Sequence, residues 1–372
     1  MDDDILLVSA RIANFADEAR DSSELYTHLS REIADDRELV SLLLYAPPLQ
    51  RRANLLFAAA HHLLLSDIAH PVAQYYASIV GHARPPNEWT FPSFRDFCLS
   101  HVDALRDIIA TRQTQTNEVQ RTAAFIPVLE QLSKSGPIAL VEVGTSAGLN
   151  LLMDRYRYKF GETEWFGELD SQVSIKCDVR TCFPPLLKKL DISSRIGIDT
   201  HPLDLCDLDD ARWLRACVWP EQAERQQRMQ AALGIARESP PEIVKGNVLD
   251  VLGDALSKIP EGVAVCVFNS ATLFYLSPEE CEEFVALLDQ FGDRELHWIS
   301  LEGGEFQTFG AKLPFDRLFT PRSNDRPTDS FGILGYAQWR GGKREDHVLG
   351  RADMHGRWIE WEAHWPESRG EC

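Results

Sequence analysis

The sequence lacks the features that mark several broad classes of protein. No apolar run reaches the roughly 18 residues that span a bilayer, and the first four residues, Met-Asp-Asp-Asp, are acidic where a secretory signal is basic. The eight cysteines include no C-x-x-C pair, so the usual spacing of a zinc site is missing. The formal net charge of −19 disfavours a broad electrostatic grip on nucleic acid. We therefore expect a cytoplasmic protein with neither a membrane nor a nucleic-acid partner.

The first third of the chain has no strand-like alternation, no repeat and no low-complexity tract. Apolar residues recur at helical spacing instead. Ser23 (or Ser22) and Asp36 are suited to capping two of the predicted helices, and Ser93 is predicted to cap a long helix that ends near Arg112. Residues 1–135 are therefore predicted to form a helical module, either a lid or a substrate platform.

From residue 138 onward, apolar β-rich runs alternate with helical ones. The predicted strands are Ile138–Val143, Val173–Val179, Arg195–Asp199, Glu242–Lys245, Val263–Asn269 and Leu296–Leu301. This alternation predicts an α/β fold with a doubly wound, Rossmann-like parallel sheet over residues 136–372. Two later segments, Phe331–Trp339 and His347–Trp365, are predicted to add antiparallel strands with turns at Gly341-Gly342 and His355-Gly356.

The turn after the first predicted strand, Gly144-Thr145-Ser146-Ala147-Gly148, admits two functional hypotheses. It fits the G-x-S-x-G elbow of a serine hydrolase, with Ser146 as the nucleophile. The partner histidine would then be one of four downstream residues: His297, His347, His355 or His364. A hydrolase elbow, however, follows several earlier strands, whereas the residues upstream of this turn are predicted to be helical.

The second hypothesis is a cofactor turn between a strand and an amphipathic helix that begins at Leu149. No Lys-Ser/Thr pair follows the glycines, and G-x-G-x-x-G is absent, so neither a P-loop nor the NAD fingerprint is present. The remaining pattern, Glu142-x-Gly144-x-x-x-Gly148, resembles the first motif of class I S-adenosylmethionine-dependent methyltransferases, with Ser146 replacing a common glycine. The resemblance implies cofactor contacts at six positions: Glu142, Gly144, Thr145, Ser146, Gly148 and Asn150. A turn that only closes a strand–helix corner would show the same glycines.

Polar residues that follow later strands extend this resemblance. An acid at the end of the second strand would bind the ribose hydroxyls, because a carboxylate accepts two hydrogen bonds from a diol. Asp199 fits that place if residues 158–194 form an insertion, while Asp170 and Asp178 remain alternatives. Asn247 follows a short strand and resembles the adenine-contacting turn, and Asn269 ends the fourth strand.

A dense polar stretch precedes the first strand. We expect Arg112, Gln115, Asn117 and Arg121 to bind a small polar or anionic substrate, since arginine holds carboxylates and phosphates by two-pronged contacts. The alternative is that these residues cap a helix and are solvated. Three further residues are candidates for catalytic roles, with His201 as the general base: His201, Glu118 and Tyr275.

Four segments together resemble an uncharacterised bacterial family, the domain of unknown function 2332. They are residues 111–118, 141–152, 195–204 and 212–220, and the resemblance covers most of the chain. That family is regarded as distantly methyltransferase-like and carries no assigned reaction. The resemblance to this family therefore supports the fold more than the function. Together with the methyltransferase-like motif, it leads us to expect an S-adenosylmethionine-dependent methyltransferase acting on a small polar or anionic substrate. The alternatives are a Ser146 hydrolase and a non-catalytic cofactor-binding protein.

Overall fold

The protein folds into two compact units. The computed structural model describes residues 2–181, 190–303, 313–318 and 331–362. The first unit comprises residues 1–116 and 204–230, and the second comprises residues 117–203 and 231–372. The predicted boundary near residue 135 differs from this division. Residues 117–135 belong to the unit that holds the sheet, and residues 204–230 return to the first unit.

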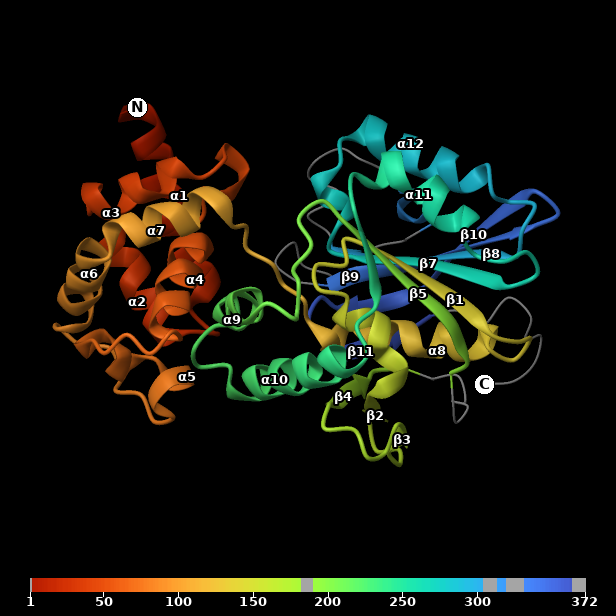
Figure 1. The fold of residues 1–372 in the computed structure, drawn as a ribbon, viewed down its shortest axis with the longest axis horizontal. Coiled ribbons are helices and arrows are strands. Elements are labelled where there is room, and N and C mark those ends of the chain that lie inside the picture. Colours follow the sequence, from red (N-terminus) through yellow and green to blue (C-terminus); the bar gives the residue numbers. More distant parts are fainter. Residues whose placement is uncertain (1, 182–189, 304–312, 319–330, 363–372) are drawn as a thin grey trace. The chain divides into compact units, whose positions relative to one another are not determined.

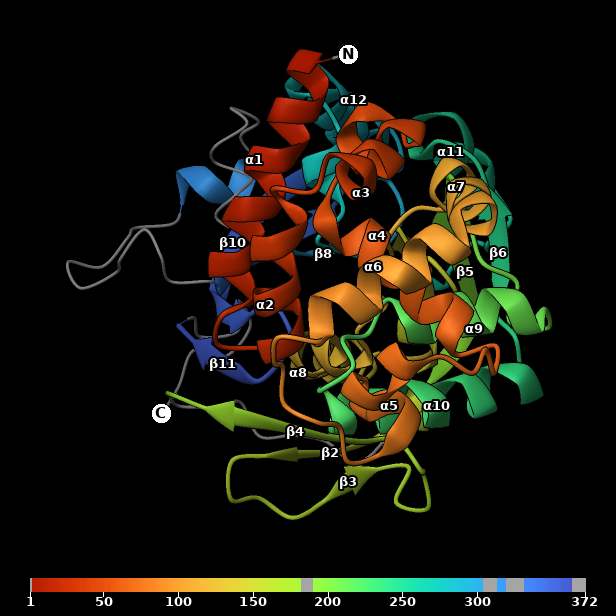
Figure 2. The same cartoon turned by 90° about the vertical axis from the view of Figure 1, so that its left-hand side faces the viewer.

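The described part of the first unit is helical (Figure 2). Its α-helices are α1 Asp2–Ala19, α2 Glu24–Ile33, α3 Arg37–Leu42, α4 Ala53–Leu64, α5 Ala77–Val80, α6 Thr90–Ser100, α7 Val102–Thr111, α9 Leu208–Ala216 and the beginning of α10 Ala223–Glu238. Three short 3-10 helices complete it, namely η1 Leu43–Tyr45, η2 Pro48–Gln50 and η3 Pro71–Tyr75. The Ser23 side chain accepts from the Tyr26 N–H, and Asp36 likewise caps α3, as predicted.

An aromatic core holds the first unit together. The rings of Tyr26 and Phe57 stack with centroids 4.2 Å apart, and Trp219 meets Tyr26 edge-on at 5.8 Å. Each large ring removes much apolar surface from water, and pairs in these geometries add roughly 1 kcal/mol beyond burial. Trp219 lies between α9 and α10, so this connection belongs to the core of the first unit although it is distant from α2 and α4 in the sequence.

The described part of the second unit contains a mixed sheet of 11 strands. Figure 1 shows this sheet. The strands are β1 Ile138–Val143, β2 Arg157–Phe160, β3 Phe166–Gly167, β4 Ser174–Val179, β5 Ile192–Asp199, β6 Glu242–Lys245, β7 Ala264–Ser270, β8 Leu296–Gly303, β9 Phe331–Arg340, β10 Lys343–Asp353 and β11 Trp358–Trp361. Their order across the sheet is β3-β2-β4-β11-β10-β9-β8-β7-β1-β5-β6. Strands β6, β5, β1, β7 and β8 are parallel, and β9 pairs with β8 in the antiparallel direction.

Helices cover both faces of the parallel strands. Helices α11 (Val248–Ser257) and α12 (Pro278–Asp289) lie on one face, and α8 (Thr122–Leu132) lies on the other (Figure 1). The first face packs on alternate strand residues such as Val141 and Val267, whereas Phe125 of α8 contacts Phe268 with ring centroids 5.3 Å apart. Strand β1 is buried along its whole length, as expected for a central strand covered on both sides.

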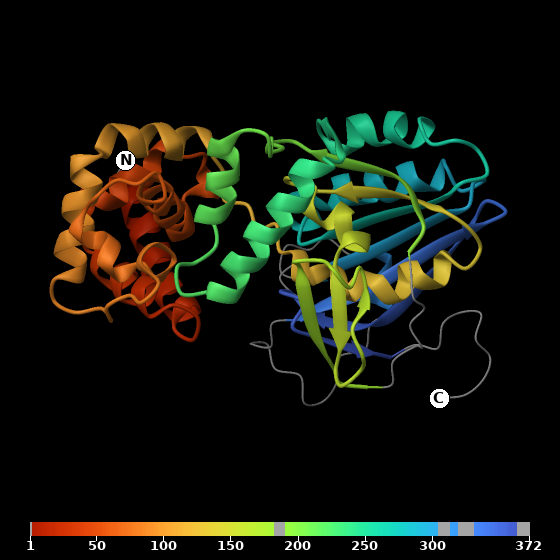
Figure 3. The same cartoon turned by 60° about the horizontal axis from the view of Figure 1, so that its bottom comes forward.

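An insertion separates the first two strands of the parallel part. Strands β2, β3 and β4 lie side by side (Figure 3), and β4 joins them to the main sheet through β11. The short 3-10 helices of this unit are η4 Val119–Arg121, η5 Leu149–Arg155, η6 Leu273–Tyr275 and η7 Pro314–Arg317. The sequence predicted an insertion here, but it did not predict β2.

The prediction of an α/β fold with a strand–helix alternation after residue 138 is confirmed, with small shifts at the strand ends. Two helix predictions in the first unit were wrong. Ser93 lies inside α6, and the expected long helix breaks at His101, whose φ of −119° and ψ of 27° are not helical. No helix of the described chain is both long and apolar enough to cross a membrane.

Candidate functional site

The second unit has a topological switch point beside β1. The chain runs from β1 outward to β5 and β6 on one side, and then crosses to β7 on the other side. In open α/β sheets, ligands bind outside the carboxyl ends of the strands at such a point. The candidate site therefore consists of the residues that end β1, β5, β7 and β8 and the turns that follow them.

Every second residue of the turn after β1 has a left-handed backbone conformation. Gly144, Ser146 and Gly148 have φ values of 74°, 55° and 75°. A Cβ at Gly144 would lie 2.2 Å from Oγ1 of Thr272, and one at Gly148 would lie 2.5 Å from Cγ of Pro241. Both glycines are therefore required by the packing of the turn against its own unit, as well as by its backbone conformation.

Backbone strain gathers at the switch point. Among the described residues, three non-glycine residues have positive φ, namely Asp67, Ser146 and Ala271. Ser146 follows β1, and Ala271, with a φ of 50°, follows the neighbouring β7. Such conformations cost of the order of 1–3 kcal/mol each and concentrate at functional sites.

The side chain of Glu142 in β1 is hydrogen-bonded to residues of the segment that follows the strand. Its carboxyl group accepts hydrogen bonds from Oγ1 of Thr145 at 2.6 Å and from Nδ2 of Asn150 at 2.9 Å. Burial raises the pKa of Glu142 to about 8, against the opposing effect of these two hydrogen bonds. Near neutral pH, the side chain of this predicted cofactor contact is therefore largely protonated.

Asp199 ends β5, the neighbour of β1, and connects the two strands. Its Oδ2 accepts the N–H of Ser146 at 2.7 Å, and its Oδ1 accepts the N–H of His201 at 2.8 Å. The alternatives Asp170 and Asp178 are exposed, and Asp178 lies on β4. Asp199 is thus the acid that ends the second parallel strand.

Two buried amide oxygens lie beside this group of residues. Asn117 donates through Nδ2 to the carbonyl oxygen of Thr145 at 2.7 Å, and Asn150 donates to Glu142. Oδ1 of each asparagine is buried without a hydrogen-bond partner among the described residues. An unsatisfied buried acceptor costs roughly 1–3 kcal/mol, so both oxygens would gain from a donor.

Glu302, near the end of β8, was not among the predicted site residues. Its carboxyl group accepts from Nδ2 of Asn269 at 2.6 Å and from the backbone N–H groups of Thr272 and Leu273. It therefore holds the strained turn that follows β7, and Thr272 of that turn packs on Gly144. Burial raises the pKa of Glu302 to about 7, against these hydrogen bonds. An acid directly after a buried strand was the available sequence signal.

Arg121, at the start of α8, influences both raised carboxyl groups. It lowers the pKa of Glu142 and of Glu302, although burial outweighs it at both. Its Nε donates to the carbonyl oxygen of Met354 at 2.7 Å. The predicted substrate residue is therefore a buried cation within the site.

Two predicted cofactor contacts have structural roles. Asn247 caps α11, because its side chain accepts the N–H of Leu249 at 3.0 Å. Asn269 is fully buried. Its Nδ2 donates to the side chains of Ser300 and Glu302, and its Oδ1 accepts from Nε1 of Trp298 at 2.7 Å. These amides are already paired within the unit.

The predicted helix after the glycine turn is also different. Residues 149–155 form the short 3-10 helix η5, with a kink at Leu152, and the chain then enters β2. The apolar residues that suggested an amphipathic α-helix are buried in this 3-10 helix, which contacts β1, β5 and α8. A helix dipole therefore gives no support to this site.

The three predicted catalytic residues lie in different environments. His201 is exposed and its Nδ1 lies 3.0 Å from Oγ1 of Thr200. Tyr275 is 57% exposed and follows the strained turn after β7. Glu118 is buried and caps η4 by accepting the Gln120 N–H at 3.1 Å. His201 and Tyr275 thus follow β5 and β7 at the switch point, whereas Glu118 has a structural role.

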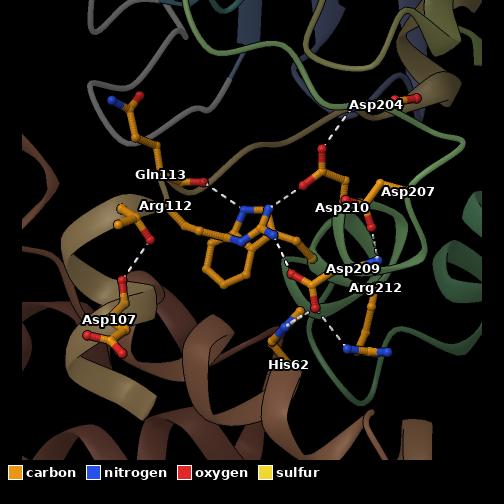
Figure 4. Close-up of polar contacts among 11 residues, drawn as sticks. His62, Asp107, Arg112, Gln113, Asp204, Asp207, Asp209, Asp210 and Arg212 are labelled. Atoms are coloured by element: carbon orange, nitrogen blue, oxygen red, sulfur yellow. Dashed lines mark hydrogen bonds and ion pairs between the residues drawn. The ribbon is translucent and has the colours of Figure 1, made fainter. Parts of the chain in front are cut away.

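The polar stretch 112–121 is divided between the two units. Arg112 and Gln115 belong to the helical unit, and the residues from Asn117 onward belong to the sheet unit. Arg112 pairs with Asp209 and with Asp210, the latter at 2.6 Å. Figure 4 shows these pairs. The Arg112 guanidinium is thus held by two carboxylates of its own unit.

Asp209 is the centre of a group of charged side chains that includes Arg112. It also accepts from Nη1 of Arg212 at 2.9 Å and lies 3.1 Å from Nε2 of His62 (Figure 4). Burial lowers the pKa of His62. The group joins the end of α7 to α9, which is a structural role for two of the segments that carry the family resemblance.

The hydrolase hypothesis needs a histidine near Ser146. His297 is aligned with Cys266 of β7, which is aligned with Leu140 of β1. Leu140 lies three positions before Val143, the last residue of β1. His347 is aligned with Tyr336 and Ile299, also within the strands. His355 lies in the turn between β10 and β11, and His364 lies outside the described residues.

Comparison with known proteins identifies the family of this chain. A search of curated proteins gives no match. The family model described as an uncharacterized protein conserved in bacteria, DUF2332, matches residues 9–361. The match extends over both units and includes every residue of the candidate site. The chain therefore belongs to the DUF2332 family.

Proposed function

We propose that the second unit binds S-adenosylmethionine at the carboxyl ends of β1, β5 and β7 and transfers its methyl group to a small polar or anionic substrate. One observation carries this proposal. The acid that ends β5, Asp199, is hydrogen-bonded to the glycine turn after β1, directly beside the switch point. That is where a ribose-binding carboxylate is expected in a nucleotide-binding α/β sheet.

The strand order supports the proposal. Numbered along the chain, the five parallel strands β1, β5, β6, β7 and β8 have the spatial order 3-2-1-4-5, and an antiparallel strand follows the fifth. A Rossmann-like half with this order, and antiparallel strands near the C-terminus, are what the methyltransferase resemblance implies.

The hydrogen-bonding groups fit three parts of the cofactor, namely its ammonium group, its two ribose hydroxyls and its positive sulfonium. The site offers the carboxylate of Asp199 and the buried oxygens Oδ1 of Asn117 and Oδ1 of Asn150. Each carboxylate oxygen of Asp199 accepts one backbone N–H and keeps acceptor capacity for a hydroxyl. A surplus of acceptors suits a donor-rich, cationic ligand.

The bound cofactor would supply an electrophilic methyl group. The residues of the chain must then align the acceptor and remove its proton where one is present. Glu302 fixes the turn that leads to Tyr275, while His201 lies two residues after Asp199 and is the candidate base. Alignment is the main requirement of such a transfer, so a site with few conventional catalytic groups is compatible with it.

Calorimetric titration of the full chain with S-adenosylmethionine, and separately with S-adenosylhomocysteine, tests the proposal. Saturable heat with both ligands is the expected result. Absence of heat with folded protein would overturn it. Binding without methyl transfer to any of a panel of small acids and amines would favour a non-catalytic cofactor-binding protein.

One observation favours the hydrolase alternative, namely the positive φ of Ser146, which is typical of a strained nucleophile elbow. A fluorophosphonate probe distinguishes the two functions. Labelling of the wild type that disappears in Ser146→Ala would support a hydrolase, and an unlabelled wild type would remove that alternative.

A further inference from the structure

A cavity of about 330 Å³ lies in the second unit, at the opposite end of the strands from the candidate site. It is formed where β8 begins, β9 ends and α8 ends. Its polar lining includes Gln131, Ser135, Arg294, Glu295, His297 and Gln338. The volume is much larger than the roughly 30 Å³ of one water molecule and falls within the range of small-molecule sites.

Polar side chains occupy the sheet face beside this cavity. His297 of β8 is aligned with Gln338 of β9, which is aligned with Glu345 of β10. Tyr336 lies in the next row on the same face. Buried faces of sheets are normally apolar, so polar residues there are more informative than exposed ones.

A chain of hydrogen bonds joins these side chains. The donor and acceptor roles along it decide which nitrogen of His297 carries the proton. The carboxylate of Glu345 only accepts, so Nε2 of Gln338 donates to it at 2.9 Å. Oε1 of Gln338 is then the acceptor for the Tyr336 hydroxyl at 3.4 Å. The Tyr336 oxygen also lies 2.9 Å from Nδ1 of His297, and when the hydroxyl proton is directed at Gln338 this oxygen accepts from a protonated Nδ1.

This arrangement leaves Nε2 of His297 as a bare acceptor. The atom is buried without a hydrogen-bond partner among the described residues, and the His297 side chain is 9% exposed. Burial, with a smaller effect from Arg340, lowers the pKa of His297 to about 4. The imidazole is thus neutral near pH 7, and the nitrogen has a lone pair to offer.

A second acceptor lies close to it. Oε1 of Glu295 is 3.8 Å from Nε2 of His297. Two acceptors at this separation are bridged well by one group with several N–H donors, and a carboxylate favours a cation in that place. A primary ammonium has three donors and the required charge.

We propose that this cavity is a binding site for a small molecule with a primary ammonium group, which donates to Nε2 of His297 and to the carboxylate of Glu295. The site is separate from the candidate cofactor site and does not depend on the function proposed above. The ammonium lies at the cavity wall, and the remaining volume holds the rest of the ligand.

Nuclear magnetic resonance on the full chain tests the site. The probes are methylammonium chloride and tetramethylammonium chloride, which have the same charge, but only the first has N–H donors. Long-range proton–nitrogen spectra report the two ring nitrogens of His297. We expect the Nδ1–H tautomer, a saturable shift of Nε2 with methylammonium at about 10 mM, near the ceiling for two heavy atoms, and no such shift with tetramethylammonium. A protonated Nε2, equal shifts with both probes or no shift with either would overturn the proposal.

Glu295→Gln provides a variant that should fold, because the Glu295 side chain is 55% exposed. We expect methylammonium binding to weaken at least about fivefold in it. Glu261→Gln, at another exposed position, is the matched control and should bind like the wild type. Unchanged binding in Glu295→Gln would exclude the proposed bridge.

Discussion

The backbone N–H of Ser146 donates to Oδ2 of Asp199 over 2.7 Å. This bond joins the turn after β1 to the end of β5, so the turn is ordered by the neighbouring strand as well as by its own glycines. The second oxygen of the same carboxylate orders the chain after β5 by accepting the His201 N–H. Asp199 is thus the residue on which the geometry of the proposed cofactor site depends most.

Asp199→Asn is expected to weaken S-adenosylmethionine binding about ten- to hundredfold, because an amide loses the charge and one acceptor for the ribose hydroxyls. Calorimetric titration measures the change. Asp178→Asn, at an exposed position of β4, is the control and should retain wild-type affinity. Equal affinity of the two variants would count against Asp199 as a ribose ligand.

Glu142→Gln is expected to remove a pH dependence of stability. The pKa of Glu142 is about 8 in the folded protein and near 4.5 when it is exposed on unfolding. The folded state therefore holds a proton that the unfolded state releases between these pH values, so the free energy of unfolding falls as pH rises, by up to about 1.4 kcal/mol per unit. The neutral glutamine lacks this term.

Urea unfolding at pH values between about 5 and 8 measures that effect. The Glu142→Gln variant should lose less stability over this range than the wild type. Glu164→Gln, at an exposed position, should follow the wild-type curve. Parallel curves for wild type and Glu142→Gln would show that the Glu142 carboxyl group titrates normally in the fold.

Local patterns predicted the parts of the fold that depend on local chemistry. The apolar run Ile138–Val143 became a central strand, and Ser23 and Asp36 became helix caps, because these outcomes need only the neighbouring residues. The prediction of an α-helix over residues 149–155 was wrong. Apolar residues at helical spacing can also belong to a segment that tertiary packing buries in another conformation, here a 3-10 helix.

The same distinction applies to the candidate site. The turn Gly144–Gly148 and the acid Asp199 were found because their residue types carry the signal. The role of Glu302 depends on two backbone N–H groups about 30 residues away, and no local pattern contains that information. Asn247 shows the converse, since an asparagine before a helix suits both a cap and a ligand contact, and the structure uses it as a cap.

Arg112→Gln is expected to destabilise the helical unit by roughly 1–3 kcal/mol, because it leaves the partly buried carboxylates of Asp209 and Asp210 without their shared cation. Arg106→Gln is the matched control, since its pair with Asp103 is exposed and should contribute less than about 1 kcal/mol. Thermal and urea unfolding compare the two. Similar small losses would show that the Arg112 pairs are no stronger than a surface ion pair.

Gly144→Ala is expected to destabilise the second unit by roughly 2–5 kcal/mol. A Cβ there would lie 2.2 Å from Oγ1 of Thr272, and alanine would also adopt a φ of 74°. Overpacking costs about 1–3 kcal/mol, and the left-handed conformation costs about 1–2 kcal/mol. Gly234→Ala in α10 is the control, because its Cβ would have nothing within 4 Å and alanine favours a helix by up to about 1 kcal/mol. Urea unfolding should therefore move in opposite directions for the two variants. A tolerated Gly144→Ala would mean that Thr272 can move away from the turn, and the tight contact between the turns after β1 and β7 would then not be a fixed feature of the site.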